Sequence, residues 1–272
     1  MTKQESIKVG AYNCWFLSDG EFDYPGNTLL PEQGDPPPIV PVPYTSVLVD
    51  TGPVRILIDT GAGGLGPKTG KLMQSLAAAG FAPEDIHTVV ASHAHPDHIA
   101  SLDQFPDAAI VMMQREFEFW TAPNTIAKLE AGDLYGLGPL EHLMASCVRE
   151  HVLPARERMR LLNQPTELAS GVLVFGAPGH TPGHAAVLIS SGREQLLYAG
   201  DAIIHPAQFE HPDWISSFDV LHNETVETRR KLLDRAAADR SLLAAFHLPG
   251  AVGLAEVHNS QFHWTPVSLT EV

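Results

Sequence analysis

The chain has 272 residues, with 17 Lys and Arg against 32 Asp and Glu, and so a formal net charge of −15 at pH 7. Because so acidic a surface repels phosphate backbones, nucleic acid is excluded as an expected partner. The first residues lack the apolar run of a signal peptide, and no stretch of eighteen apolar residues follows. We therefore expect a cytoplasmic protein with no membrane partner. The two cysteines, Cys14 and Cys147, are expected to be small buried hydrophobes.

Thirteen residues near the N-terminus, 31–43, include six prolines. Proline fixes φ and removes an N–H donor, so this stretch predicts an extended arm that serves as a lid, a dimer contact or a plain surface loop. The arm lies too close to the N-terminus to separate two domains. No repeat or low-complexity linker divides the chain elsewhere, so residues 1–272 are predicted to form a single domain.

Taken in chain order, the first predicted elements are two β-branched runs, 45–49 and 54–58, which indicate a hairpin. Helices are predicted at 68–79, ending at Gly80, and at 115–120, 137–150 and 224–238, the last capped by Asn223. The remaining predicted strands are 86–92, 109–113, 172–175, 185–189, 196–199 and 242–246. Mixed strands and helices with antiparallel hairpins favour an α+β fold, in which helices cover sheets.

A cluster of metal-binding side chains begins where the strand 86–92 ends. The sequence reads His93-Ala94-His95-Pro96-Asp97-His98. Alternate residues of an extended turn point the same way, so His93 and His95 converge on one point, and the turn brings Asp97 and His98 toward a second. Imidazoles with a carboxylate suit zinc, manganese, cobalt or iron. The alternative is a chance grouping of polar residues, which would pack poorly at a strand end.

Three more candidate ligands follow other predicted strands: His180, Asp201 and His247. Strand ends are rigid, and several that each present one polar side chain to a common cleft can build a site. Six residues supply at most four ligands, so these three additions allow a site for two metals.

The ordered series His93–His98, Pro178-Gly179-His180, Gly200-Asp201 and His247 resembles the signature of metallo-β-lactamase-fold hydrolases, with Asp59-Thr60-Gly61 as its first motif. The resemblance implies a four-layer αββα sandwich and a homodimer. It implies that the first metal is held by His93, His95 and His180. The second would be held by Asp97, His98 and His247, and Asp201 would bridge the two.

The resemblance also assigns supporting residues. Asp59 would orient the ligands, although a turn aspartate is an equal alternative, and His184 would be structural or would support the ligands without binding metal. Seven further histidines are predicted to be ordinary surface or core residues: His87, His142, His151, His211, His222, His258 and His263.

Two neighbouring metals can share a hydroxide as nucleophile and stabilise both oxygens of a displacement. Asp97 is the predicted catalytic residue, because it would orient that hydroxide and carry a proton to the leaving group. These features predict a metal-dependent hydrolase acting on ester bonds, with two divalent ions per chain. Zinc is the expected metal, and manganese, cobalt and iron suit the same ligands.

Within the superfamily, several stretches resemble the methyl parathion hydrolase and lactonase branch: 17–20, 117–120, 207–209, 247–250 and 262–267. That branch implies a small-molecule substrate, namely a lactone, an aryl ester or an organophosphate triester. Asp201 stands where zinc-cysteine β-lactamases carry a cysteine, which disfavours β-lactams. Ile204 stands where the best-known acyl-homoserine lactonases carry a tyrosine. The alternatives are a mononuclear-iron persulfide dioxygenase and a glutathione thioesterase on the same fold.

The substrate pocket is the least specified part of the site. Phe117, Phe119 and Trp120 are candidates for an apolar wall, and the alternative is that they pack a helix into the core. His205, four residues after Asp201, is a further candidate for the lining.

Overall fold

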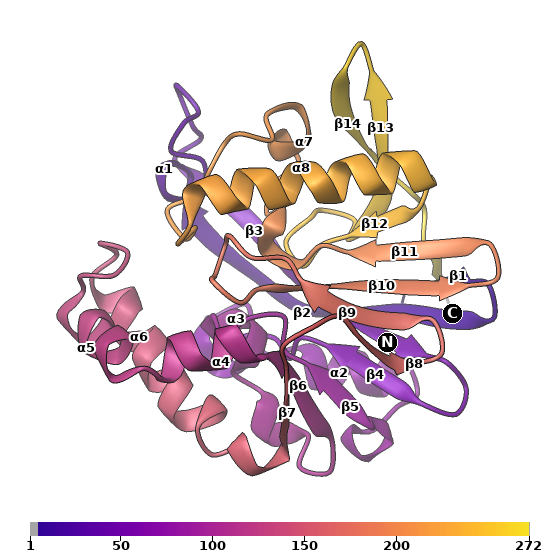
Figure 1. Cartoon of the computed structure of the whole chain (residues 1–272), viewed down its shortest axis with the longest axis horizontal. Coiled ribbons are helices and arrows are strands. Elements are labelled where there is room, and N and C mark those ends of the chain that lie inside the picture. The colour runs from indigo at the N-terminus through magenta and orange to yellow at the C-terminus, as the bar shows by residue number, and fades with distance from the viewer. Residues whose placement is uncertain (1–4, 272) are drawn as a thin grey trace.

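In the computed structural model, which describes residues 5–271, two β-sheets stack face to face, with helices on both outer faces (Figure 1). The first sheet has the strand order β15-β1-β2-β3-β4-β5-β6-β7, antiparallel through β4 and parallel from β4 to β7. Its strands are β1 (Glu5–Val9), β2 (Tyr12–Pro25), β3 (Ile39–Asp50), β4 (Arg55–Ile58), β5 (Thr88–Val90), β6 (Ala109–Met113), β7 (Met159–Leu162) and β15 (Thr270–Glu271).

The second sheet has the order β14-β13-β12-β11-β10-β9-β8, and only its β11–β12 pair is parallel. Its strands are β8 (Thr166–Ala169), β9 (Val172–Gly176), β10 (Ala185–Ser191), β11 (Glu194–Tyr198), β12 (Leu242–Ala244), β13 (Val252–His258) and β14 (Gln261–Pro266). The hairpin of β13 and β14 projects beyond the rest of the sheet (Figure 1).

The alternation of side chains along the strands explains the layers. In β4, Ile56 and Ile58 lie in the core between the sheets, whereas Leu57 lies in a separate core beneath the helices that cover the first sheet. Successive side chains of a strand point to opposite faces, so a strand covered on both faces is apolar throughout. The predicted α+β fold with four layers, αββα, is confirmed.

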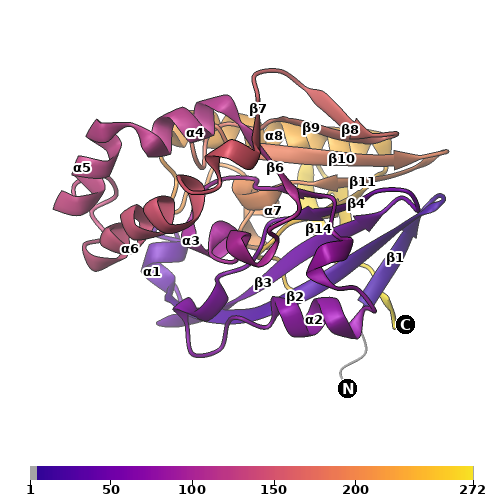
Figure 2. The ribbon, with the colours of Figure 1, turned by 90° about the horizontal axis from the view of Figure 1, so that it is seen from below.

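Helices cover the two outer faces unequally. The bounds are α1 (Gly26–Leu29), α2 (Leu72–Ala78), α3 (Pro96–Ile99), α4 (Gln114–Thr121), α5 (Pro123–Ala131), α6 (Pro139–Cys147), α7 (Ala207–Glu210) and α8 (His222–Asp239). The long α8 packs Leu232, Leu233 and Ala236 on the second sheet. Figure 2 shows α4, α5 and α6 grouped at one end of the sandwich, away from the chain termini. Within residues 5–271, no helix has the length and apolarity needed to span a bilayer.

Both cysteines are buried and unpaired, as the sequence predicts. Cys14 lies between the sheets, and Cys147 lies under the first sheet's helices. Burial raises the pKa of each thiol to about 12, so neither is a reactive nucleophile.

The proline-rich stretch differs from the predicted arm, because only residues 31–38 form a loop. From Ile39 the chain is already in β3, where Pro41 pairs with Asp23 and Pro43 with Glu21 of β2. Strand β4 pairs only with Val47–Asp50, so the proline-bearing half of β3 has a free edge. Proline is tolerated there because no neighbouring strand requires its missing N–H.

Other differences concern helix ends and strands without a clear pattern. The helix expected over 68–79 begins at Leu72, and the one expected over 137–150 ends at Cys147 in a π-helical turn. Asn223 is not a cap, since α8 begins one residue earlier and Leu221 precedes it without a side-chain bond. The sequence patterns did not predict strands β1, β2, β7 and β8 or helix α5.

Candidate metal centre

All seven candidate ligands lie where strands end, at one edge of the sandwich. The first sheet supplies the four that follow β5, and α3 begins within that group at Pro96. The second sheet supplies His180 after β9, Asp201 after β11 and His247 after β12. Strands β9, β11 and β12 run in the same direction, so their carboxyl ends meet at the same edge. The structure thus brings together the ligands that were predicted from strand ends and from the family resemblance.

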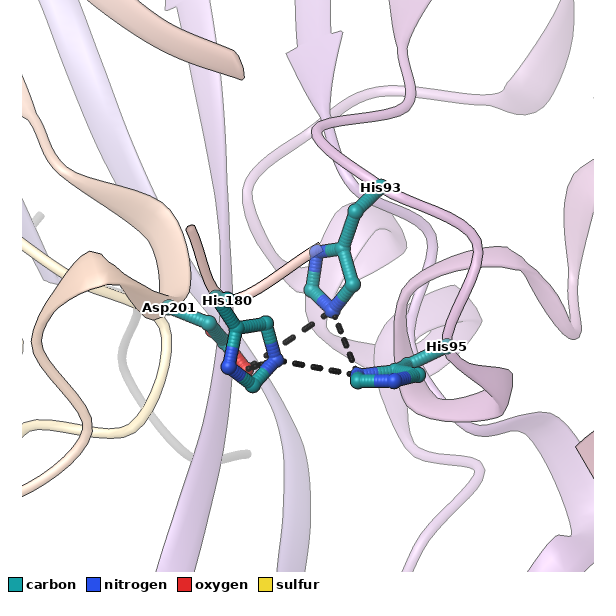
Figure 3. Close-up of side chains that lie close together, drawn as sticks. All are labelled: His93, His95, His180 and Asp201. Carbon is teal, nitrogen blue, oxygen red and sulfur yellow. Dashed lines mark hydrogen bonds and ion pairs between the residues drawn. The ribbon is translucent and has the colours of Figure 1, made fainter. Parts of the chain in front are cut away.

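The ligand atoms form two groups. In the first, His93, His95, His180 and Asp201 each present one atom within 4.8 Å of the others. Figure 3 shows the three imidazoles converging beside the carboxylate. Nδ1 of His95 lies 2.9 Å from Nε2 of His93 and 3.0 Å from Nε2 of His180. Oδ2 of Asp201 lies 3.4 Å from Nε2 of His180.

The second group joins Asp97, His98 and His247, whose ligand atoms also lie within 4.8 Å of one another. Oδ2 of Asp97 is 3.3 Å from Nε2 of His247 and 3.8 Å from Nε2 of His98. Oδ2 of Asp201 is 3.4 Å from Nε2 of His98 and 3.1 Å from Nε2 of His247. The Asp201 carboxylate thus lies between the groups, in the position that a bridging ligand requires.

Each of the five histidines has a partner for the ring nitrogen that faces away from the cluster. Such partners fix the tautomer and the ring orientation of a metal ligand. Two of the partners are hydroxyl groups: Nδ1 of His93 lies 3.1 Å from the Ser92 hydroxyl, and Nε2 of His95 lies 2.9 Å from the Tyr135 hydroxyl. Two are carboxylates: Nδ1 of His98 lies 2.9 Å from Oδ2 of Asp59, and Nδ1 of His180 lies 2.8 Å from Oδ1 of Asp219. The fifth is a backbone group, since Nδ1 of His247 lies 3.1 Å from the carbonyl oxygen of Pro43.

The donor set fits divalent cations. Among the described residues, Nε2 of His98 and Oδ1 of Asp201 are buried polar atoms without a hydrogen-bond partner. Such atoms are rare in folded proteins, and both point to a ligand of another kind. Imidazole nitrogens with carboxylate oxygens are the donors that zinc and its neighbours in the first transition series prefer.

The electrostatics of the two groups favour the same conclusion. Burial lowers the pKa of His93 and His95 well below the ordinary value, which keeps them in the neutral form that binds metal. Burial also acts to lower the pKa of His247, but the negative charges of Asp201 and Asp97 outweigh this effect and raise the pKa of His247 to about 9. The carboxylates therefore favour positive charge at this position, as a bound cation would supply.

Asp59 is fully buried behind the second group. Its Oδ1 accepts a hydrogen bond from the Ser92 N–H at 2.7 Å, and its Oδ2 accepts from the Tyr198 hydroxyl at 2.6 Å and lies 2.9 Å from Nδ1 of His98. Its φ of 62° is unusual for a non-glycine residue and strains the backbone by roughly 1 kcal/mol. The contacts hold His98 in place at that cost.

His184 lies outside both ligand groups. Its Nε2 accepts a hydrogen bond from the backbone N–H of Asp201 at 3.0 Å, and its Nδ1 lies 3.1 Å from the carbonyl oxygen of Ala177. It therefore fixes the turn that presents Asp201. Seven of the eight remaining histidines were predicted to be ordinary, and they are exposed or half-buried and take no part in the two groups: His87, His142, His151, His211, His222, His258 and His263.

A cavity of about 380 Å³ opens over the ligands, within the usual range for small-molecule sites. Asp97, His95, His180, Asp201 and His247 form its floor. Its walls are largely apolar and come from the β2–β3 ribbon, from α1, from α6 and from loop residues. They include Phe22, Tyr24, Leu29, Val42, Tyr44, Leu137, Leu140, Leu143, Met144, Ile204 and Phe218.

The pocket residues proposed from the sequence do not line this cavity. Phe117, Phe119 and Trp120 pack into the core beneath the helices. The Trp120 ring stands edge-on behind His95, with centroids 5.4 Å apart, and its indole N–H bonds to Glu116. His205 is not among the lining residues, and its Nδ1 accepts a hydrogen bond from the N–H of Ala207, the first residue of α7. The helix that carries the aromatic residues therefore supports the ligand loops from behind.

Sequence reasoning missed the cavity walls and several ligand supports. The spacing of Leu137, Leu140, Leu143 and Met144 marks one apolar helix face, but nothing in it distinguishes a cavity wall from the core. Glu116, Asp219 and Tyr135 also escaped notice. Glu116 alone left a signal, since a carboxylate four residues before Trp120 shares its helix face.

Comparisons with known proteins agree with this geometry. The sequence profile of the Metallo-beta-lactamase superfamily matches residues 39–247. A probable metallo-hydrolase of Mycobacterium tuberculosis is 31% identical over 216 residues, which cover 75% of this chain and 64% of that protein. An N-acyl homoserine lactonase of Bacillus thuringiensis is 24% identical over 150 residues, 55% of this chain and 51% of the lactonase. The chain thus spans about half to two thirds of these curated relatives.

Two solved structures match nearly the whole chain. AidC, a dizinc quorum-quenching lactonase in complex with a product, is 28% identical, covers 99% of both chains and superposes with a TM-score of 0.89. The hydrolase AbOPH is 25% identical and covers 100% of this chain and 99% of its own, with a TM-score of 0.86. With its fold, its profile match and its ordered ligands, the chain belongs to the metallo-beta-lactamase superfamily. Its two His/Asp clusters are consistent with a dinuclear site, as in dizinc AidC.

Proposed function

We propose that this chain is a dinuclear metal-dependent hydrolase that opens the ester bond of a small, largely apolar substrate, with lactones as the preferred class. The observation behind the proposal is that Asp201 lies between two complete ligand groups on the floor of an apolar cavity. The likeness to a dizinc lactonase over nearly the whole chain supports the same class. Aryl esters and organophosphate triesters are the next substrates to consider.

His93, His95 and His180 would hold one ion, Asp97, His98 and His247 the other, and Asp201 would contact both. Two bound divalent cations would supply a nucleophile from water at neutral pH and polarise the ester carbonyl. Asp97 belongs to the floor of the cavity, so its carboxylate is placed to take the proton of the attacking water. The ring C–O bond then breaks and releases an alkoxide. Asp97 would return the proton to this alkoxide, which completes the hydrolysis.

Tyr24 and Tyr44 supply hydrogen-bond donors to the substrate. Both line the cavity, and their hydroxyl oxygens are 2.6 Å apart. One hydroxyl donates to the other, which leaves the second proton of the pair free to donate to a bound carbonyl oxygen. Ile204, buried in the same wall, has no donor to offer. The phenol pair thus serves as the donor that the side chain at 204 cannot provide.

The cavity is poorly suited to anionic substrates. Among its described lining residues, none is Lys or Arg, and Asp97 and Asp201 lie on its floor. Carboxylate groups of glutathione or of a β-lactam would find no cationic partner beyond the metal ions. Neutral lactones, aryl esters and triesters match the lining better, which is why the thioesterase reading ranks below them.

A hydrolysis panel on the zinc-loaded chain tests this function. It includes lactones of increasing acyl length, an aryl ester, a phosphotriester, a β-lactam and a glutathione thioester. We expect the highest kcat/KM on a lactone and none on the β-lactam. Activity confined to the thioester, or oxygen consumption with a persulfide by an iron-loaded chain, would replace the proposal with one of its alternatives. The homodimer and the cytoplasmic location stay predictions.

A further inference from the structure

A buried carboxylate, that of Glu116 on α4, lies outside the ligand set and outside the cavity. Its Oε1 accepts hydrogen bonds from the Ala94 N–H at 3.0 Å and from the indole N–H of Trp120 at 2.6 Å. Its Oε2 accepts from the Thr181 hydroxyl at 2.7 Å and from the Gly183 N–H at 2.9 Å. Four hydrogen bonds offset part of the cost of burying this charge.

Three of the four partners of Glu116 belong to the two loops that supply the histidines of the first ligand group, and the fourth, Trp120, lies on α4 itself. Ala94 stands between His93 and His95, and Thr181 directly follows His180. One oxygen of the carboxylate therefore holds the loop with two of the histidines, and the other oxygen holds the loop with the third. None of the four hydrogen bonds reaches a ligand side chain of the second group, although Asp97 and His98 follow His95 on the same loop.

The chemistry of this contact requires a carboxylate. All four partner groups act as donors, and only an ionised carboxylate accepts at both of its oxygens. An amide in its place would present an NH₂ group to two of the four. The fit is also tight, since a Cβ added to Gly183 would lie 2.0 Å from the backbone nitrogen of Glu116. Glycine at 183 thus lets α4 approach the His180 loop at backbone distance.

We propose that Glu116 is a positioning residue for one of the two metal sites, that of His93, His95 and His180. It sets the separation of the two loops and thereby the distance between their imidazole nitrogens. The second site has its own supports in Asp59 and in the carbonyl oxygen of Pro43. The inference rests on the dinuclear site proposed above and not on the identity of the substrate.

The test compares E116Q with E118Q by competition between the zinc-loaded protein and a chelator. Glu118 lies on the same helix but is exposed, and its side chain bonds only to Gln114. We expect E118Q to retain both ions as the wild type does. In E116Q, one ion should bind about 10- to 100-fold more weakly, the usual effect of losing a partner that orients a ligand.

Double variants identify the site that is affected. H180A removes a ligand of the first site, and H247A removes one of the second. If Glu116 supports the first site, E116Q weakens zinc binding little further in H180A but strongly in H247A. The reverse order would contradict the assignment, and so would equal loss in both.

A milder variant guards against misfolding of E116Q. T181V keeps the carboxylate and removes one of its four hydrogen bonds, so it should weaken the same ion by a smaller factor. Thermal unfolding of the zinc-free variants separates a structural role from a positioning role. A fall in Tm with unchanged relative affinities of the two ions would overturn the proposal. A wild-type chain that binds only one ion would instead contradict the dinuclear function.

Discussion

The floor and the wall of the cavity are built in opposite ways. Every histidine of the floor is fixed twice, by its cluster and by a hydrogen bond to its outer nitrogen. The wall formed by Leu137, Leu140, Leu143 and Met144 offers only apolar contact. Directional bonds fix atoms to a geometry, whereas apolar packing tolerates changes of shape. The floor should therefore determine whether the protein is active, and the wall which substrates it accepts.

Replacing Asp201 with Ala should give the largest effect. The substitution removes the carboxylate that lies between the groups and deprives His98 and His247 of one of their anionic partners. We expect kcat/KM to fall at least about 100-fold, with loss of bound metal, because a direct ligand matters more than an orienting partner. Elemental analysis measures the bound metal, and lactone hydrolysis measures kcat/KM.

His184→Ala is the matched control, since His184 bonds to the backbone of Asp201 without belonging to a ligand group. We expect a loss of about 10-fold. If H184A lost as much metal as D201A, the distinction between ligand and support would fail.

Removing the metals should destabilise the fold. Without cations, the negative charges of Asp97 and Asp201 lie close together in a buried site. In addition, ions that bind only the folded chain stabilise it by mass action, and chelation removes that stabilisation. We expect chelation to lower Tm by roughly 10 °C, and added zinc to restore it. An unchanged Tm in calorimetry would show that the floor does not depend on metal for its geometry.

Truncating the wall should change specificity without changing metal content. Leu140→Ala widens the cavity on the α6 side. We expect KM to rise about 10-fold for a long-chain lactone and little for a short one, since each buried methylene adds to binding. A metal content below that of the wild type would mean that wall and floor are coupled.

The smallest effect is expected at the phenol pair. Tyr44→Phe removes one hydroxyl of the pair and leaves the aromatic contact with His247, at 5.2 Å between ring centroids. Losing one neutral hydrogen bond should lower kcat/KM about fivefold. Tyr24→Phe should act to a similar extent. Tyr12→Phe, whose hydroxyl bonds to Ser170 away from the cavity, should have no effect.

The same contrast explains what the sequence could predict. The ligands could be predicted because His93–His98 is a local pattern and because His180, Asp201 and His247 each follow a recognisable strand. The cavity wall could not be predicted, because the leucines of α6 have the same spacing whether they face a cavity or the core. Its position depends on how α6 packs, which is a tertiary property.

Strand β2 shows a second limit. Its segment Ser18-Asp19-Gly20-Glu21 has the composition of a turn, yet it continues a 14-residue strand through a β-bulge. The buried Asp19 carboxylate explains this, because it accepts hydrogen bonds from the N–H groups of Ala62 and Leu72. Tyr24 lies beyond the bulge, so the phenol pair was hidden with the strand that carries it. No local pattern reports a hydrogen bond made 43 residues away.

The ligands are divided between the two sheets, and this has a consequence for how the protein matures. When the first sheet's ligands have left the ribosome, His180, Asp201 and His247 have still to be synthesised, so only an incomplete set is available to capture an ion. The full coordination sphere forms when the second sheet docks, across sequence separations that make folding slow. We therefore expect the proposed pair of ions to bind only after the two sheets have docked, and a chain cut between the sheets to lose both.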